Sequence, residues 1–264
     1  MIPLIGKVEK YINDRVQKDG AILSILIDPC DYSTPQKAIE TALLAVEAGT
    51  DILGVGGSTG AQGELLDSVI KGIKKETDVP IVLFPGNIAT ISASADAVFF
   101  MSLLNSRNPY WISQAQMLSA PMIKKMGIEA LPTGYILVEP GGTAGWVGDA
   151  NLVPRNRPKL AAALALSAQL AGRRMVFTDA GSAAFDHIPL EMITTVRKAI
   201  DAIYIVGGGI RTPEQAGKVV AAGADCLSIG TAAEETKDVK ALVKEFVKII
   251  KQKGKEKIEK GLIR

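Results

Sequence analysis

The sequence has few of the residues that build zinc sites, catalytic triads or disulfide frameworks. Its 264 residues include one histidine, His187, and two cysteines, Cys30 and Cys226, which are far apart and lack metal-ligand spacing. A single histidine excludes His-clustered zinc sites and makes a Ser/His/Asp triad improbable. Two isolated cysteines are typical of a reducing compartment, so we expect a cytoplasmic protein.

Long apolar runs and an excess of one charge are also missing. The Ala/Leu-rich stretch 160–171 is too short to span a bilayer, and residues 5–16 have the pattern of an amphipathic helix rather than a signal peptide. The formal net charge is +2, without a basic arm, so we expect no nucleic-acid partner. The Lys-rich segment 252–264 is interpreted as a solvated tail, with contact to a membrane surface as the alternative.

Aliphatic residues dominate instead: hydrophobic residues make up 47% of the chain and aromatic residues 5%. Apolar runs alternate with helical patterns, as expected for parallel strands that are buried on both faces. The strands are expected at 21–28, 51–57, 80–86, 97–103, 130–139, 174–181, 201–209 and 225–231. The helices are expected at 34–48, 63–77, 109–126, 157–171, 189–199, 213–222 and 237–251.

Right-handed crossovers close eight such strands into a (β/α)8 TIM barrel of the α/β class. We expect one domain over 1–264, with an additional helix within 1–20. The third connection is unusual, because only ten residues separate Gly86 from Ala97. We expect a loop there in place of the third helix, with a merely short helix as the alternative.

A missing helix opens the wall of the barrel and makes room for a long apolar ligand. The groove is expected to involve apolar residues near this opening: Ile88, Ile91, Phe99, Met101, Tyr110 and Trp111.

Glycines end the last two expected strands, at Gly208, Gly209 and Gly230. The loops after strands 7 and 8 of such barrels commonly bind phosphate, because glycine lets backbone N–H groups approach phosphate oxygens closely. The pattern therefore predicts a ligand that carries phosphate. The alternative is that these glycines only make tight strand-to-helix turns.

Acidic side chains end three other strands, at Asp28, Glu139 and Asp179. Asp28 with the hydroxyl of Ser58 on the neighbouring strand offers oxygen ligands to a hard cation such as Mg²⁺. Ser33 and Thr34 follow Asp28 and can cap the next helix, which leaves Asp28 free for a metal. Either Glu139 or Asp179 could accept a proton from a substrate hydroxyl.

Several of these segments together resemble the geranylgeranylglyceryl phosphate synthase family over about residues 20–250. The most specific is Tyr135-Ile-Leu-Val-Glu-Pro-Gly-Gly-Thr-Ala-Gly-Trp-Val-Gly-Asp149. The others are Asp28-Pro29, Val55-Gly-Gly-Ser58, Phe84-Pro-Gly-Asn87, Ala180-Gly-Ser182, Val206-Gly-Gly-Gly-Ile-Arg211 and Gly230-Thr231. The resemblance implies a modified barrel without its third helix. It also implies Mg²⁺-dependent joining of geranylgeranyl diphosphate to sn-glycerol 1-phosphate, the first ether bond of archaeal membrane lipids.

By the same resemblance, Asp28 and Ser58 match the metal ligands of the family. Its glycerol phosphate site is matched by Phe177, Thr178, Asp179, Ala180, Gly181, Ser182, Ala183, Gly208, Gly209, Gly230 and Thr231. The family usually has Tyr-Leu-Glu-Ala-Gly-Ser-Gly where this chain has Phe177-Thr-Asp-Ala-Gly-Ser-Ala183. The lost phenol and shorter carboxylate leave three readings: Asp179 acts through a water, Glu139 is the base, or the polyol acceptor differs.

Two other functions remain open from the residues alone. A phosphosugar isomerase or aldolase would use the same scaffold, although an aldolase needs a strand-end lysine and no expected strand ends in one. A non-catalytic barrel that binds a phosphorylated ligand is the second. In each case we expect a homo-oligomer, because barrels often pair through their helix faces.

Overall fold

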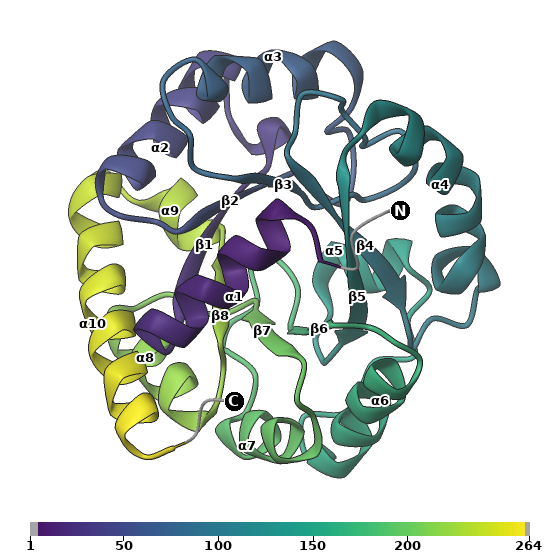
Figure 1. Ribbon diagram of the computed structural model, residues 1–264, viewed down its shortest axis with the longest axis vertical. Helices are drawn as coiled ribbons and strands as arrows, with labels where there is room; N and C mark the ends of the chain where they lie inside the picture. Colours follow the sequence, from purple (N-terminus) through teal and green to yellow (C-terminus); the bar gives the residue numbers. More distant parts are fainter. Residues whose placement is uncertain (1–4, 262–264) are drawn as a thin grey trace.

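The computed structural model describes residues 5–261 and confirms the closed parallel barrel (Figure 1). The strands neighbour one another in chain order, and β8 pairs back to β1. They are β1 (Ile22–Ile27), β2 (Ile52–Val55), β3 (Ile81–Leu83), β4 (Ala97–Leu103), β5 (Glu129–Leu137), β6 (Met175–Asp179), β7 (Ile203–Gly207) and β8 (Cys226–Ile229). Every expected strand is present, mostly shorter, because most of the strand-end glycines and acids belong to the loops.

Helices surround the barrel as expected (Figure 1). The longer ones are α1 (Lys7–Asp19), α2 (Pro35–Glu47), α3 (Gly63–Lys74), α4 (Ala115–Met126), α6 (Pro158–Leu170), α7 (Leu190–Ala199), α8 (Pro213–Ala222) and α10 (Val239–Glu259). Three short elements were not predicted: α5 (Gly142–Val147), α9 (Thr231–Glu235) and a 3₁₀ turn (Pro29–Asp31). All three lie in loops near the strand ends, where the apolar periodicity is weak. The helix expected at 109–126 is present, with its first turn a π-helical turn (Tyr110–Gln114) that leads into α4.

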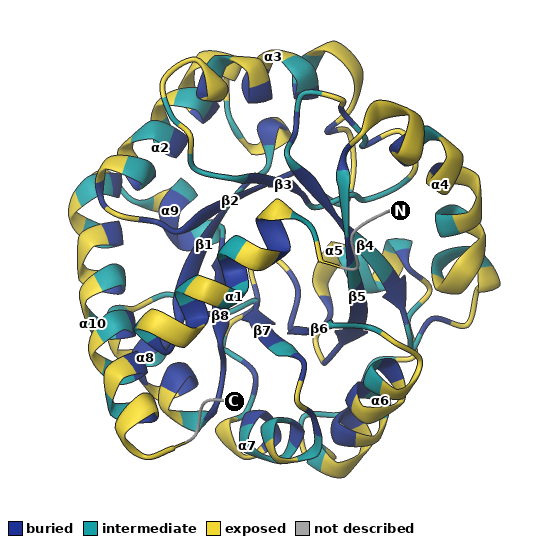
Figure 2. Cartoon of the chain, in the orientation of Figure 1, coloured by how far each residue is buried: buried dark blue, intermediate teal, exposed yellow. Residues whose placement is uncertain are grey.

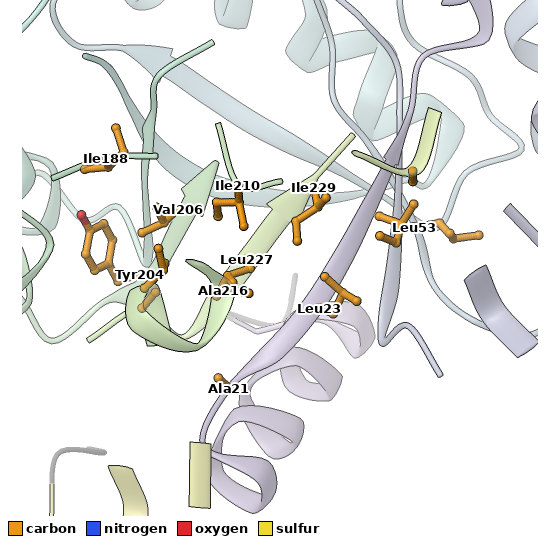
Figure 3. Packing of buried hydrophobic residues seen from close by; sticks show 14 of the residues in the cluster. Ala21, Leu23, Leu53, Ile188, Tyr204, Val206, Ile210, Ala216, Leu227 and Ile229 are labelled. Atoms are coloured by element: carbon orange, nitrogen blue, oxygen red, sulfur yellow. The ribbon is translucent and has the colours of Figure 1, made fainter. Parts of the chain in front are cut away.

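Side chains alternate along each strand between the barrel interior and the layer beneath the helices. Figure 3 shows outward-facing residues of this second layer, where Val206 of β7 and Leu227 of β8 pack near Ala216 of α8. The strands and the inner sides of the helices are therefore buried, while the outer helix faces are exposed (Figure 2).

The N-terminal end of the barrel is closed by α1, which lies across its opening (Figure 1). Val8, Ile12 and Val16 of α1 pack against interior residues such as Ile22 and Ile52. A ligand must therefore enter from the opposite end, where the carboxyl ends of the strands meet.

Residues 84–96 connect β3 to β4 without a helix, which confirms the expected loop. The loop is fixed by local hydrogen bonds: the Ala89 N–H donates to Asn87 Oδ1 over 2.7 Å, and the hydroxyl of Ser92 donates to Asp67 of α3. The wall of the barrel is thus left open between β3 and α4 by an ordered segment.

The prediction of a solvated tail from residue 252 is wrong as far as Glu259, because α10 continues to that residue. Lys257 is only 2% exposed, and its Nζ donates to Asp225 Oδ1 over 2.6 Å and to the carbonyl of Ala224 over 2.8 Å. A buried carboxylate thus draws this part of the Lys-rich segment onto the barrel. Residues 262–264 of the predicted tail and 1–4 of the predicted N-terminal segment lie outside the described residues. Within 5–261 no helix has the length and apolarity needed to cross a membrane.

Candidate active site

A polar cavity opens at the carboxyl end of the barrel, among the ends of β1, β2, β6, β7 and β8. Most of the predicted site residues line it, namely Asp28, Ser58, Asp179, Gly181, Ser182, Ala183, Gly208, Gly209, Gly230 and Thr231. Among the described lining residues there is no lysine, so a Schiff-base aldolase would lack its nucleophile here.

Three predicted substrate-binding residues do not line this cavity. Thr178 and Ala180 follow the outward face of the strand, and the Thr178 hydroxyl shares a 2.9 Å hydrogen bond with the Tyr204 hydroxyl beneath the helices. Phe177 points inward but lies below the cavity, 1% exposed, in edge-to-face contact with Phe84 and Tyr135. Alternation along β6 therefore leaves Asp179 as the side chain of this strand that reaches the cavity.

Asp179 is held by a tyrosine of the neighbouring strand that residue types alone did not single out. The hydroxyl of Tyr135 on β5 donates to Asp179 Oδ2 over 2.7 Å, and the Gly181 N–H donates to Oδ1 over 2.7 Å. Burial raises the pKa of Asp179, while these two hydrogen bonds pull it back down. Burial beside Asp179 also raises the pKa of Tyr135. A carboxylate made more basic by burial is suited to accept a proton.

Glu139, the other predicted base, is placed differently. It is exposed, lines neither cavity, and its Oε2 accepts a 3.3 Å hydrogen bond from the Arg155 N–H. Its place just past a strand end suggested proximity to the site, but β5 ends at Leu137, two residues earlier, and the side chain of Glu139 faces solvent. The structure does not bring Glu139 together with Asp179.

The glycines after β7 are required by both conformation and close contact. Gly208 and Gly209 have φ of 77° and 70°, in the left-handed region. A Cβ on Gly208 would lie 2.6 Å from Asp179 Oδ1, and one on Gly209 would lie 2.1 Å from the carbonyl oxygen of Asp186. Both positions therefore require glycine, and both residues line the cavity. Arg211 is the one cationic side chain among the described lining residues.

Asp28 does cap a local turn, contrary to the prediction that other residues would do so. Its Oδ1 accepts a 2.9 Å hydrogen bond from the Cys30 N–H at the start of the 3₁₀ turn, while Thr34 caps α2. The second oxygen, Oδ2, lies so close to Gly57 that a Cβ there would be 1.7 Å away. Burial raises the pKa of Asp28 to about 6.

The donor set around Asp28 fits a hard divalent cation. Ser58, Asp31 and Glu234 line the same cavity and supply only oxygen atoms. Burial, with Asp31 and Asp28 nearby, raises the pKa of Glu234 to about 7, so these carboxylates share one region of low dielectric. Among residues 5–261 there is no group of three or more His, Cys, Asp or Glu that could hold a metal ion, so protein carboxylates alone would not complete its coordination. Such a set suits Mg²⁺, which commonly keeps waters and binds substrate phosphates alongside one or two carboxylates.

An apolar groove lies at the opening in the barrel wall that the missing helix leaves. Five of the six predicted residues line it, namely Ile88, Ile91, Phe99, Met101 and Trp111. Tyr110 does not; its ring instead packs edge-to-face on Trp111, with 4.8 Å between centroids. The groove continues along α4 past Gln116 and Ser119 to Ile123.

The groove and the polar cavity share a wall. Both are lined by Gly57, Ser58, Phe84, Tyr135 and Ala144. The rings of Phe84 and Tyr135 pack edge-to-face here, with 5.8 Å between centroids. A long apolar ligand and a polar ligand would therefore meet beside the Tyr135 hydroxyl and Asp179.

Residues 16–250 match the PcrB family. The chain belongs to the PcrB family. It is 52% identical over 246 residues to the geranylgeranylglyceryl phosphate synthase of Thermococcus sibiricus, covering 93% of this chain and 96% of that one. It is 51% identical over 241 residues to the enzyme of the same name from Methanothermobacter thermautotrophicus, covering 91% and 97%.

The PcrB-family chain is also similar to solved structures. The crystal structure of (S)-3-O-geranylgeranylglyceryl phosphate synthase from Thermoplasma acidophilum, in complex with its substrate sn-glycerol-1-phosphate, is 39% identical. It superposes with a TM-score of 0.88 over 96% of this chain and 99% of that one. The thiamine phosphate pyrophosphorylase of Pyrococcus furiosus, at 13% identity and a TM-score of 0.60, shares the fold alone.

Proposed function

We propose that this PcrB-family chain is a prenyltransferase that joins geranylgeranyl diphosphate to the 3-hydroxyl of sn-glycerol 1-phosphate. The products are geranylgeranylglyceryl phosphate, which contains the first ether bond of archaeal membrane lipids, and diphosphate. The wall shared by the apolar groove and the polar cavity carries the proposal, because the reaction needs a long hydrocarbon and a phosphorylated polyol to meet at one point. The relatives named above and the substrate of the Thermoplasma acidophilum enzyme support it.

Each substrate has a region of matching chemistry. The glycine loops after β7 and β8 offer backbone N–H groups to the phosphate of the glycerol phosphate, with the guanidinium of Arg211 on the same cavity. The guanidinium is paired with Glu235 over 2.8 Å, an exposed pair of the kind that contributes only about 0–1 kcal/mol. The prenyl chain would bury its apolar surface in the groove, with its diphosphate towards Ser58 and Asp28.

The reaction then follows from the groups at the shared wall. The 3-hydroxyl oxygen of the glycerol phosphate forms a bond to the allylic carbon, the bond from that carbon to the diphosphate oxygen breaks, and diphosphate leaves with the electron pair. Asp179 takes the hydroxyl proton, and Tyr135 holds the carboxylate in place through its 2.7 Å hydrogen bond. Anchoring both substrates converts the encounter into a step within one complex.

We further propose that Asp28 and Ser58 hold Mg²⁺, with Asp31 and Glu234 close enough to contribute charge. When bound, Mg²⁺ neutralises negative charge on the departing diphosphate. A cation is needed on electrostatic grounds as well. The described lining of the cavity has four carboxylates (Asp28, Asp31, Asp179 and Glu234) against the single guanidinium of Arg211, before two phosphorylated substrates enter.

The test is diphosphate release by the purified protein, with each substrate omitted in turn and with Mg²⁺ present or removed by chelation. Release should need both substrates and the metal, and should be lost in Asp28→Ala. Asp14→Ala is the matched control, because Asp14 is an exposed carboxylate on α1, at the other end of the barrel, where it pairs with Lys10. No release with both substrates and Mg²⁺ present would contradict the proposed function.

The cytoplasmic location and the homo-oligomer are proposals on the same footing. Light scattering of the purified protein tests the second, since a molar mass equal to that of one 27.9 kDa chain would contradict it.

A further inference from the structure

We infer that Arg155 is a positioning residue, which holds the β6–α7 loop in the shape that binds the phosphate of the polyol substrate. The inference rests on the proposed function, because it concerns the loop that lines the polar cavity. Arg155 itself does not line that cavity. It lies outside the loop, half-buried, with 24% of its side chain exposed.

The guanidinium joins two loops that are about thirty residues apart in the chain. Nη2 donates to the carbonyl oxygen of His187 over 2.7 Å and lies 3.4 Å from Asp186 Oδ2. Nη1 reaches the carbonyl oxygen of Glu139 over 3.4 Å, and the guanidinium carbon lies 5.4 Å from the ring centre of Phe185. One side chain therefore contacts three consecutive residues of the β6–α7 loop and the start of the loop that follows β5.

The segment that carries Arg155 is fixed to the barrel by backbone hydrogen bonds. Val153, two residues earlier, pairs with the strand extension at Val138, and its N–H donates to the Leu137 carbonyl over 3.0 Å. The Arg155 N–H also donates to Glu139 Oε2 over 3.3 Å. This contact assigns Glu139 a role in orienting Arg155 instead of the proton transfer considered from the sequence.

The loop that Arg155 holds lies directly on the phosphate-binding glycines. The carbonyl oxygen of Asp186 lies against Gly209, where a Cβ would come within 2.1 Å of it. At its start the loop contacts Thr231, whose Oγ1 accepts a 3.4 Å hydrogen bond from the Ala183 N–H. A shift of Asp186 would therefore move the backbone around Gly209.

Two buried residues hold the loop to the core, Ala184 at 3% exposed and Ile188 at 0% exposed. The three residues between them are exposed or partly exposed, and Phe185 has 74% of its surface in solvent. Ala183, just before them, has a φ of 57°, in the region that residues other than glycine avoid. Arg155 contacts all three residues of the stretch between Ala184 and Ile188, so it is placed to hold that stretch from outside the loop.

Without Arg155 the loop would sample several shapes, and binding the phosphate would have to order it again. We expect Arg155→Ala to weaken binding of sn-glycerol 1-phosphate about tenfold, which corresponds to about 1.4 kcal/mol. The KM for the prenyl diphosphate should stay within about twofold, because the apolar groove does not touch this loop. The kcat at saturating glycerol phosphate should fall less than the KM for glycerol phosphate rises.

Calorimetric titration of sn-glycerol 1-phosphate tests this without relying on turnover, and steady-state kinetics give the two KM values. Arg157→Ala is the matched control, since Arg157 is exposed and its Nη1 donates to the carbonyl of the neighbouring Asn156, over 3.4 Å. Arg155→Lys should recover part of the affinity, because an ammonium group can still bond to the His187 carbonyl.

Equal affinity for glycerol phosphate in Arg155→Ala and the unmodified protein would overturn the inference while leaving the proposed function intact. An equal rise in both KM values would overturn it too, since that result indicates general destabilisation. If Arg155→Ala does not fold, Arg155→Lys and Asp186→Asn carry the same comparison.

Discussion

Replacing Tyr135 by phenylalanine should change the pH dependence of the reaction more than the stability of the fold. The substitution removes one oxygen atom and leaves the edge-to-face packing of the ring on Phe84 and Phe177 in place. What it deletes is the 2.7 Å hydrogen bond to Asp179 Oδ2, one of the two hydrogen bonds that lower the pKa of this buried carboxyl. The bond from the Gly181 N–H remains.

The magnitude follows from the charge on the acceptor. A hydrogen bond to a charged group contributes about 1.5–3 kcal/mol. At about 1.36 kcal/mol per factor of ten, its loss disfavours the ionised carboxylate about ten- to a hundredfold, so the pKa of Asp179 should rise further. Asp179 must be ionised to accept the hydroxyl proton, so the acidic limb of kcat/KM moves to higher pH. Below that limb activity falls about ten- to a hundredfold, and it recovers as the pH rises.

The assay is diphosphate release across the pH range, for the unmodified protein, Tyr135→Phe and the control Tyr204→Phe. The control makes the same chemical change in another buried tyrosine, whose hydroxyl bonds to Thr178 on the outer side of β6. It should leave the profile where it is. The reasoning is refuted if Tyr135→Phe loses activity equally at every pH, or if its acidic limb coincides with that of the unmodified protein.

Three further predictions concern the proposed metal site, the β6–α7 loop and the buried ion pair of α10. Gly57→Ala should abolish Mg²⁺-dependent turnover as completely as Asp28→Ala, because the added Cβ would lie 1.7 Å from Asp28 Oδ2. Electron paramagnetic resonance of bound Mn²⁺ shows whether the variant has lost its metal site while it remains folded. Ala183→Gly should raise the free energy of unfolding by about 1 kcal/mol with activity retained, since the backbone there is left-handed with φ of 57°; thermal unfolding measures it. Lys257→Met should lower the free energy of unfolding by about 3 kcal/mol, because it breaks the buried ion pair with Asp225. The loss should not be larger, because Arg197 still pairs with Asp225. Denaturant unfolding measures the change, and kcat should stay the same.

The barrel could be predicted because the strands are apolar runs, most of which end in glycine or an acid, and this is a local property. The missing third helix followed from a chain length between Gly86 and Ala97 that is too short for one. The helical structure of residues 252–259 and the burial of Lys257 could not be predicted from the local sequence. Lys257 looks like any solvated lysine until α10 is placed against Asp225, which is 32 residues away in the chain.

In the candidate site, too, some features follow from the local sequence and others depend on how the strands are placed. The glycine loops and Asp28 could be located from strand ends, whereas the pairing of Tyr135 with Asp179 needed the register between β5 and β6. Leu137 lies opposite Asp179, so Tyr135 is its diagonal neighbour on the same inward face. Alternation along both strands, combined with their adjacency in the barrel, was the available signal. The expectation that Glu139 lies at the cavity failed, because a position just past a strand end does not fix which way the following loop turns.

The missing helix and the position of the catalytic groups are linked by geometry. A complete barrel wall would confine ligands to the carboxyl end, as in phosphate-binding barrels that act on small substrates. Opening the wall after β3 leaves Phe84, just past that strand, and residues of β4 from Val98 to Met101 along the groove. The groove therefore meets the polar cavity at Gly57, Ser58 and Phe84 past the ends of β2 and β3, at Tyr135 of β5 and at Ala144 of α5. The proton acceptor must be within reach of that junction, and Asp179, through its bond to Tyr135, is the carboxylate on the β5–β6 side that meets this condition.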